Sequence, residues 1–563
     1  MVLNNSLYRR KLWVFFVLII FCLTGLCVRV FYLVTVKGEE YSQKSKELQE
    51  RERTISAVRG DILDRNGIVI ATNETAYNIS VIHNQITDED KVIKVLSENL
   101  NMDEAEVRKK VEKVTSIEKI KNNVDKELGD KIKEYKLDGV KVDEANKRFY
   151  PNQDLFSKVI GFAGSDGQGV VGLETVYDEY LTGENGKIYT VCDGRGVEVD
   201  GQRETRIPPS KGKNLVTTLD VNIQKLCQEK AQMAYESNQA DGVSVIVMNP
   251  QNGEIYAMVD YPEYDLNNPF VGDDLNEIWR NGCVSDTYEP GSTFKIVTTA
   301  VALEENKVEL DENFFCPGYI TVEDRRIRCH KTTGHGSETF EVAIQNSCNP
   351  VFIELGLRIG SKTFYSYFEE LGLLKKTGID LPGEASTIMH EKDKIGQVEL
   401  ATISFGQSFQ ITPVQLMTTV SSLINGGNRV TPHIGKQVIN QDGSIEEELE
   451  FDVESGICSQ ETSETLRMLL EKVVSEGGGS NAYIEGYAIG GKTATSQTIP
   501  RSENVYISSF LGFYPADNPQ IMVLIKIDNP KGAYYGGIIA APVAKDVFTE
   551  LIPYCEKQMN NVY

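Results

Sequence analysis

The segment Ser292-Thr293-Phe294-Lys295 places a hydroxyl group and an ammonium group three positions apart. Glu289-Pro290-Gly291 precedes it as a turn, and apolar residues continue at helical spacing behind it through position 303. Ser292 is therefore predicted at a helix N-terminus, where backbone N–H groups and the helix dipole favour developing negative charge. Lys295 falls one turn on, on the same helix face. A buried lysine with a depressed pKa can accept the serine proton, so the pattern predicts a nucleophile activated without histidine.

Spacing alone does not separate this chemistry from a capping serine followed by a surface lysine. The same Ser-x-x-Lys pattern occurs at Ser116…Lys119 and at Ser210…Lys213. Two later segments favour the catalytic interpretation of Ser292. They are Ser347-Cys348-Asn349 and Gly491-Lys492-Thr493-Ala494-Thr495.

In this order, the three motifs resemble those of the penicillin-recognising serine enzymes. The block 289–295 looks like the active-site signature of penicillin-binding proteins. Residues 59–67 (Arg-Gly-Asp-Ile-Leu-Asp-Arg-Asn-Gly), with Gly172-Leu173-Glu174, resemble the pedestal of class B (monofunctional) members. Further matches are Ser404-Phe405-Gly406-Gln407 and Thr412-Pro413-Val414-Gln415. The resemblance extends over nearly the whole chain, and it implies a peptidoglycan D,D-transpeptidase.

The resemblance also implies a role for each motif residue. Ser292 would be the acylated nucleophile, Lys295 its general base, and Ser347 the relay that protonates the leaving group. The implied binding groups are Asn349 for the amide of the acyl chain, Lys492 and Thr493 for the donor's terminal carboxylate, and the backbone N–H groups of Ser292 and Thr495 as the oxyanion hole. This chain has Ala494 where the family usually has glycine, and we expect an altered substrate fit there rather than loss of chemistry.

The implied reaction is a ping-pong acyl transfer between peptidoglycan stem peptides. The nucleophile attacks the penultimate D-alanine carbonyl, D-alanine leaves, and an amino group of a neighbouring stem displaces the enzyme. β-Lactams mimic the D-Ala-D-Ala end and would trap Ser292. No organic cofactor is implied.

Two other functions remain open at the level of sequence. The first is a D,D-carboxypeptidase or β-lactamase that uses the same residues with water as the acceptor, although a soluble hydrolase needs no pedestal. The second is a non-enzymatic role in which the pedestal activates a polytopic glycan polymerase of the shape, elongation, division and sporulation family. Such a polymerase is an expected partner in either case.

Three cysteines and a histidine between positions 316 and 348 have the composition of a metal site. Cys316, Cys329, His335 and Cys348 would supply three thiolates and one imidazole, the donor set of a tetrahedral structural zinc. Cys348 is also the middle residue of Ser-x-Asn, so a metal would pin that loop beside the active site. Some class B penicillin-binding proteins involved in rod shape carry zinc at this position, and this segment resembles theirs. The alternatives are a Cys316–Cys329 disulfide or free thiols, and His330 is a reserve ligand.

The first 36 residues predict a membrane anchor. Leu12–Val28 carries no charge and follows Arg9, Arg10 and Lys11, and with Arg29 at the interface Leu12–Val34 can span a bilayer. The basic cluster predicts a cytoplasmic N-terminus and an extracytoplasmic remainder, in a single-pass protein of the bacterial cell membrane. A cleaved signal peptide is the alternative, but no small-x-small site follows the apolar run.

Composition and periodicity set the rest of the expected architecture. The net charge of −24 excludes a nucleic-acid partner. We expect an α+β fold in three parts: cytoplasmic tail and transmembrane helix (1–36), an elongated mixed pedestal domain for dimerisation (37–214), and a penicillin-binding transpeptidase domain (215–563) with an antiparallel sheet flanked by helices. Expected elements are helices at 87–140, 220–234 and 541–557, a hairpin at Asn66-Gly67, and strand pairs at 243–248 with 254–259 and 505–513 with 521–527.

Overall fold

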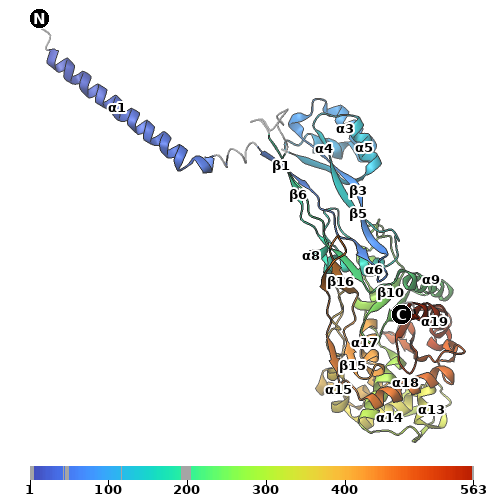
Figure 1. Cartoon of the computed structure of the whole chain (residues 1–563). Coiled ribbons are helices and arrows are strands. Elements are labelled where there is room, and N and C mark those ends of the chain that lie inside the picture. The colour runs from blue at the N-terminus through green and yellow to red at the C-terminus, as the bar shows by residue number, and fades with distance from the viewer. Residues whose placement is uncertain (1–4, 42–43, 45–49, 116, 192–204, 561–563) are drawn as a thin grey trace. The chain divides into compact units, whose positions relative to one another are not determined.

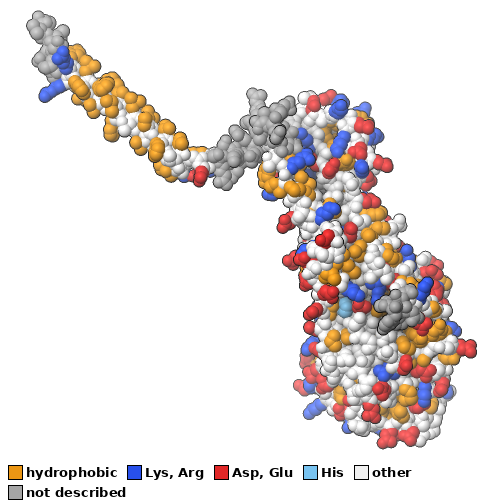
Figure 2. All heavy atoms as spheres, viewed as in Figure 1, with side chains coloured by type: hydrophobic (Ala, Val, Ile, Leu, Met, Phe, Trp, Pro, Cys, Tyr) orange, Lys and Arg blue, Asp and Glu red, His pale blue; other side chains and the backbone are white. Residues whose placement is uncertain are grey.

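The computed structural model describes residues 5–41, 44, 50–115, 117–191 and 205–560 (Figure 1). The predicted N-terminal apolar helix is confirmed as α1 (Asn5–Thr35). Within it, Tyr8–Thr35 has a mean hydropathy of 2.7 over its most apolar stretch, and hydrophobic side chains cover its length (Figure 2). At 1.5 Å per residue, the 28 residues of Tyr8–Thr35 extend about 42 Å, which is more than the ~30 Å hydrocarbon core of a bilayer. The helix is long and apolar enough to be a membrane anchor.

The chain divides into two compact units. The first unit comprises Met1–Ala57, Thr75–Asn146 and Glu184–Ser210, and the second comprises Val58–Glu74, Lys147–Gly183 and Lys211–Tyr563. The second unit is thus built from three segments that are separated in the sequence.

The first unit contains two small groups of strands and three amphipathic helices. β1 (Glu50–Ile55) pairs antiparallel with β6 (Gly186–Val191), which pairs with β7 (Thr205–Ile207). The second half of β3 (Val69–Val81) pairs with β4 (Glu118–Asp125), and β5 (Val140–Phe149) also pairs with β3. The helices are α3 (Glu89–Leu100), α4 (Glu104–Val111) and α5 (Lys126–Glu134).

The expectation of continuous helix over 87–140 is wrong at β4. Ile120 and Val124 are buried in this strand. Residues four apart lie on one face of a strand as well as of a helix, so their spacing does not distinguish the two. The side chain of Asp88 caps α3 by accepting a hydrogen bond from Lys91 N.

A five-stranded antiparallel sheet forms the centre of the second unit. Its strand order is β10-β9-β21-β20-β19, which confirms both predicted strand pairs. The bounds are β9 (Gly242–Met248), β10 (Ile255–Tyr261), β19 (Gly490–Gln497), β20 (Tyr506–Tyr514) and β21 (Ile521–Asp528). β19 is an edge strand of this sheet.

Helices cover both faces of this sheet, as the alternation of its side chains requires. Val243, Val245 and Val247 pack in one core with α9 (Val221–Asn238) and α19 (Gly536–Asn560). Ile246 and Met248 pack in the other core with the helices of the opposite face. Those include α12 (Lys295–Glu304), α17 (Pro413–Ile424) and α18 (Gln460–Ser475). The predicted α+β fold is confirmed.

The second unit contains further helices and strands around this sheet. The helices are α6 (Ser157–Ile160), α7 (Leu173–Val176), α8 (Asp178–Leu181), α10 (Leu275–Trp279), α11 (Gly282–Ser285), α13 (Phe340–Gln345), α14 (Asn349–Ile359), α15 (Ser361–Glu370) and α16 (Gln397–Ile403). The strands are β2 (Ile62–Leu63), β8 (Asn214–Thr217), β11 (Asn313–Cys316), β12 (Tyr319–Val322), β13 (Arg325–Arg328), β14 (Gly336–Thr339), β15 (Asn428–Val430), β16 (Gly435–Ile439), β17 (Ile445–Glu448) and β18 (Val453–Ser455). β2 and β3 form the hairpin predicted at Asn66-Gly67.

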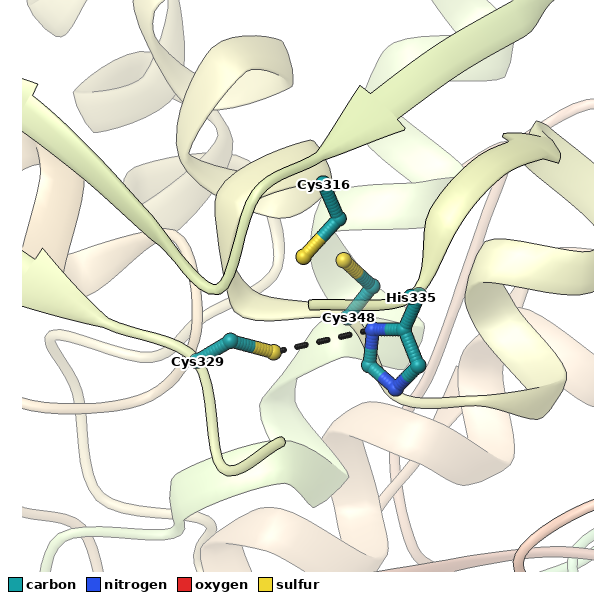
Figure 3. A group of neighbouring side chains, drawn as sticks. All are labelled: Cys316, Cys329, His335 and Cys348. Carbon is teal, nitrogen blue, oxygen red and sulfur yellow. Dashed lines mark hydrogen bonds between the residues drawn. The ribbon is translucent and has the colours of Figure 1, made fainter. Parts of the chain in front are cut away.

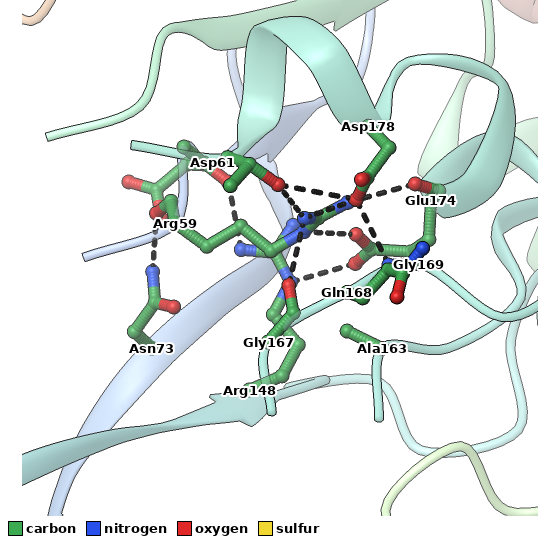
Figure 4. A network of polar contacts seen from close by, with 12 residues as sticks. Arg59, Asp61, Asn73, Arg148, Ala163, Gly167, Gln168, Gly169, Glu174 and Asp178 are labelled. Carbon is green, nitrogen blue, oxygen red and sulfur yellow. Dashed lines mark hydrogen bonds and ion pairs between the residues drawn. The ribbon is translucent and has the colours of Figure 1, made fainter. Parts of the chain in front are cut away.

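A buried ion network joins two of the second unit's segments (Figure 4). Glu174 is fully buried, and its two carboxylate oxygens accept from Arg59 Nε and Arg148 Nε, each at 2.6 Å. Arg59 also donates to Asp178 at 2.6 Å, and Arg148 donates to the carbonyl of Gly60 at 2.7 Å. The two arginines and two acids balance in charge, as buried charges must. The motifs at 59–67 and 172–174 therefore meet in one polar core.

Candidate active site

The predicted nucleophile lies in a tight turn that begins a helix. Gly291–Phe294 form a 3₁₀ turn that continues as α12. Ser292 is half-buried and lines a cavity of about 630 Å³. The backbone N–H of Gly291 donates to the carbonyl of Gly406 at 2.9 Å. A Cβ atom at Gly406, whose φ is +86°, would lie 2.0 Å from the Gly291 oxygen. Glycine at 406 is thus what allows the two backbones to meet.

Lys295 is buried and its ammonium group is fully occupied by the second motif. The residue is 1% exposed, and Nζ donates to Ser347 O at 2.8 Å, Ser347 Oγ at 3.1 Å and Asn349 Oδ1 at 2.7 Å. Burial lowers the pKa of Lys295 to about 8, against the opposing effect of nearby acidic groups. The burial expected to depress the lysine pKa is therefore present, and at pH 7 about a tenth of this amine is neutral.

The connection between α13 and α14 presents the second motif. Ser347 has a left-handed φ of +51°, an uncommon conformation for a serine. Two backbone hydrogen bonds hold this reversal, from Ser347 N to Ile344 O at 3.0 Å and from Cys348 N to Ala343 O at 2.9 Å. Cys348 then precedes α14, with Pro350 in its first turn. The strained turn places the side chains of Ser347 and Asn349 at the cavity.

Strand β19 supplies the third motif, and its side chains alternate between the cavity and the interior. Thr493 and Thr495 line the cavity, whereas Lys492 is 1% exposed and points inward. Lys492 and Lys295 line the same small void. Burial, and then repulsion by Lys295, lower the pKa of Lys492. Thr493 and Thr495 thus reach the cavity directly, while Lys492 lies behind the strand.

Ala494 lies close to the nucleophile turn. It is buried, and a Cβ built on Gly291 would lie 3.6 Å from the Ala494 methyl, an ordinary van der Waals distance. The methyl shares the inward face of β19 with Lys492 and Ser496. It therefore occupies space beside the turn without crowding it.

Sequence spacing did not reveal an aromatic stack and an ion pair at this site. The rings of Tyr506 and Tyr534 are stacked at 4.2 Å, those of Tyr534 and Tyr535 at 4.7 Å, and all three residues line the cavity. Buried Glu289, just before the nucleophile turn, accepts from Arg501 Nη2 at 3.0 and 2.9 Å. The position of Glu289 directly before Pro290-Gly291 indicates that it lies near the nucleophile turn. Nothing in the sequence, however, indicates that Arg501 is its partner.

The predicted metal ligands converge beside the Ser-x-Asn motif (Figure 3). The ligand atoms of Cys316, Cys329, His335 and Cys348 all lie within 4.8 Å of one another. None of the three cysteines forms a disulfide in the structure, which does not favour the alternative Cys316–Cys329 bridge. His335 Nδ1 is 3.7 Å from Cys329 Sγ (Figure 3), and Nδ1 of His330, whose side chain is exposed, is 3.8 Å from the same sulfur atom.

The surroundings of this Cys3His group fit a bound cation. Oε1 of Glu338 is buried, lies 3.7 Å from His335 Nδ1 and has no hydrogen-bond partner among the described residues. A buried carboxylate oxygen without a partner is costly unless positive charge lies near it. The four residues could therefore hold a metal ion whose preferred ligands are thiolate and imidazole.

Comparisons with known proteins agree over most of the chain. Residues 243–549 match the family model of the penicillin binding protein transpeptidase domain, and residues 54–217 match that of the penicillin-binding protein dimerisation domain. The chain is 39% identical to stage V sporulation protein D of Bacillus subtilis, over 98% of this chain and 86% of that protein. It is 30% identical to a probable peptidoglycan D,D-transpeptidase, PenA, of Neisseria meningitidis, over 93% of this chain and 89% of that protein.

A solved structure shows the same fold. The crystal structure of penicillin binding protein 3 of Mycobacterium tuberculosis, complexed with aztreonam, superposes with a TM-score of 0.68 at 25% identity. The alignment covers 90% of this chain and 97% of that one.

The contact of Gly406 with the nucleophile turn leads to a stability prediction. We expect Gly406→Ala to lower the thermal unfolding midpoint more than Gly443→Ala does. Both glycines have positive φ, but nothing lies within 4 Å of a Cβ at Gly443, so that variant measures backbone strain alone, of about 1–3 kcal/mol. Equal losses in the two variants would show that the contact with Gly291 is unimportant. Differential scanning calorimetry of the two purified variants makes the comparison.

Proposed function

The chain belongs to the class B penicillin-binding proteins and is a peptidoglycan D,D-transpeptidase, and from this premise we propose that Ser292 is its acylated nucleophile. The observation that carries the assignment is the convergence of Ser292, Ser347, Asn349, Thr493 and Thr495 on one cavity, with buried Lys295 beneath it. Distant segments supply the five cavity groups, so the convergence does not follow from chain proximity.

Acylation begins with attack of Ser292 Oγ on the carbonyl carbon of the penultimate D-alanine. The neutral fraction of Lys295 accepts the hydroxyl proton, directly or through Ser347 Oγ, to which Nζ lies at 3.1 Å. The new C–O bond forms as the peptide C–N bond breaks, and Ser347 passes the proton to the departing D-alanine nitrogen. Backbone N–H groups of Ser292 and Thr495 stabilise the oxyanion.

Deacylation is the second half of the acyl transfer. An amino group of a neighbouring stem peptide attacks the ester carbonyl, loses its proton through the same Ser347–Lys295 pair, and releases Ser292. The product is a peptide crosslink. Water as acceptor would instead make the chain a carboxypeptidase or β-lactamase, which the match of residues 54–217 to the dimerisation domain does not favour.

The donor peptide binds along β19 in this proposal. An edge strand offers unpaired backbone groups to an extended peptide, and β19 is such an edge. Thr493 holds the donor's terminal carboxylate by its hydroxyl, and Lys492 acts from behind the strand, where the arriving negative charge favours its protonated form. Asn349 binds the amide of the acyl chain.

We also propose that the Cys3His group binds zinc. Three thiolates and one imidazole are a closed structural donor set, in which zinc crosslinks the segments that carry its ligands. Cys348 would thereby tie the Ser347–Asn349 turn to the segments bearing Cys316, Cys329 and His335.

For the membrane, we propose that α1 anchors the chain with its N-terminus in the cytoplasm. Arg9, Arg10 and Lys11 lie at the start of the apolar stretch, which favours that orientation. A polytopic glycan polymerase is the proposed partner, because the transpeptidase needs glycan strands to crosslink.

The nucleophile assignment predicts a covalent adduct. Full-length protein in detergent, incubated with excess benzylpenicillin, should gain the mass of one penicillin, and peptide mapping should place it on Ser292. Ser292→Ala should gain nothing. Ser210→Ala, which changes another Ser-x-x-Lys serine, should react as the wild type does. An unmodified Ser292 in folded protein would refute the assignment.

The lowered pKa of Lys295 predicts the pH dependence of that reaction. Below about pH 8 the protonated ammonium cannot accept the Ser292 proton, so the acylation rate should rise with pH and reach half its plateau near pH 8. Lys295→Arg stays protonated and should be slow throughout. Stopped-flow acylation rates between pH 6 and 10 test this, and a flat wild-type profile would contradict it.

The metal assignment predicts close to one zinc per chain by elemental analysis. Cys348→Ser should lose most of it, while Cys458→Ser, which changes a buried thiol outside the group, should retain it. His330→Ala should also retain zinc, because His335 is the assigned ligand. A metal-free protein with full penicillin reactivity would overturn the proposal.

A further inference from the structure

A short basic hairpin stands out in an acidic chain. The segment 325–331 (Arg-Arg-Ile-Arg-Cys-His-Lys) contains four lysine and arginine residues and no acidic residue, although the chain carries a net charge of −24. This segment, called the hairpin below, comprises β13, which pairs with β12, then the turn after β13 and the start of the loop that leads to His335. The turn before β13 is the acidic pair Glu323-Asp324, and Asp324 lies 3.7 Å from Arg325 Nε, so Arg325 is already paired. This accumulation of positive charge has no part in the acylation chemistry described above.

The hairpin is fixed to the wall of the active-site cavity. Asn349 Nδ2 donates to the carbonyl of Arg328 at 3.2 Å, which joins the hairpin to the Ser-x-Asn motif. Cys329, the next residue, belongs to the Cys3His group. His330 and Lys331 then line the same cavity as Ser292. The basic segment is therefore held at the mouth of the catalytic cavity.

The strand register directs its charges outward. Ile327 pairs with Ile320, and both pack against the hydrophobic core, while Arg326 and Arg328 lie on the opposite face. The guanidinium of Arg326 lies over the Tyr319 ring, 3.6 Å from its centroid. The side chains of Arg328 and Lys331 are exposed, and among the described residues neither has an ion-pair or hydrogen-bond partner. Lys331 is thus an uncommitted cation at the cavity, and Arg328, whose carbonyl bonds Asn349, is a second one three residues before it.

We propose that Arg328 and Lys331 bind a carboxylate of the peptidoglycan stem peptide other than the terminal one that β19 holds. The inference rests on the proposed function, because the ligand is a part of that substrate. A chain of net charge −24 repels anionic wall strands, so a local basic patch is what brings such a strand to the cavity. A guanidinium and an ammonium group carried by one short segment suit a carboxylate, which Arg328 can engage with two donors.

Position separates this site from the donor's terminal carboxylate. The hairpin belongs to the part of the wall that carries Ser347 and Asn349, whereas Thr493 and Thr495 come from the edge strand β19. The hairpin therefore sets specificity for the body of a stem peptide, not for its D-Ala-D-Ala end.

The test compares two synthetic stem pentapeptides, one with its internal carboxylate free and one with it amidated. Steady-state D-alanine release is measured with full-length wild type and with Arg328→Ala/Lys331→Ala. We expect the double variant to raise KM for the free-carboxylate peptide about five- to tenfold, with kcat nearly unchanged, since two partly exposed charge contacts are each worth up to about 1 kcal/mol. The KM for the amidated peptide should not change.

A matched control removes the same charge elsewhere. Lys375→Ala/Lys376→Ala changes two exposed lysines outside the cavity lining and should leave both KM values as in the wild type. Added salt should raise the wild-type KM for the free-carboxylate peptide and have little effect on that of the double variant. Zinc content and penicillin acylation of the double variant should equal those of the wild type, which shows that its catalytic machinery is intact.

The outcomes distinguish this inference from the function beneath it. Absence of a penicillin adduct on Ser292 in the wild type would overturn the proposed function. A normal adduct with the same KM for both peptides, in both proteins, would overturn the hairpin assignment alone. The double variant could instead lose binding to a glycerol phosphate oligomer while its KM for the peptides stays unchanged. That result would show that the hairpin binds phosphodiesters, and it would also overturn the hairpin assignment.

Discussion

The interaction on which this site depends is the burial of one ammonium group between two oxygens and an amide. Lys295 is 1% exposed, and its three hydrogen bonds all go to Ser347 and Asn349. Taking a cation out of water is costly, and those acceptors offset part of the cost. The same burial lowers the pKa of Lys295 to about 8 and so makes the amine a usable base. The hydrogen bonds of this buried group thus hold the turn, while its burial lets the amine lose its proton near neutral pH.

That ammonium group also explains why the Ser-x-Asn turn can be strained. Ser347 has a left-handed φ, which for a residue with a Cβ atom costs about 1 kcal/mol or more. Lys295 binds both its carbonyl and its hydroxyl oxygen, and Cys348 lies within the Cys3His group. The turn is therefore held from the α12 side by a lysine and from the other side by the cysteine cluster. Pre-organisation of this kind holds the hydrogen-bonding groups of the turn in position before the substrate binds.

The sequence was informative wherever rare residue types or ordered motifs carried the signal. Cysteine and histidine are few, so Cys316, Cys329, His335 and Cys348 could be grouped without knowing the fold, and the structure brings them within 4.8 Å. The two strand pairs of the central sheet followed from apolar runs bounded by turns. β4 was missed because Ile120 and Val124 fit a helix face equally well. The tyrosine stack and the Glu289–Arg501 pair join segments whose meeting depends on loop paths, for which spacing holds no information.

The edge position of β19 brings a structural liability and the proposed binding mode together. An open edge invites pairing with any extended chain, and proteins usually protect such edges. Here the edge borders a deep cavity, Gly536 donates to Thr495 Oγ1 at 2.9 Å, and a Cβ at Gly536 would lie 2.1 Å from the Ala494 carbonyl oxygen. The start of α19 thus lies against part of the strand and limits the length of edge that a peptide can reach. Ala494 also lines this cavity, and its methyl lies near the nucleophile turn, so the accessible stretch of β19 is bounded by that turn as well. In the proposed binding mode, a peptide that adds to this stretch of β19 would bring its carbonyl towards Ser292, and strand pairing would be coupled to acyl transfer.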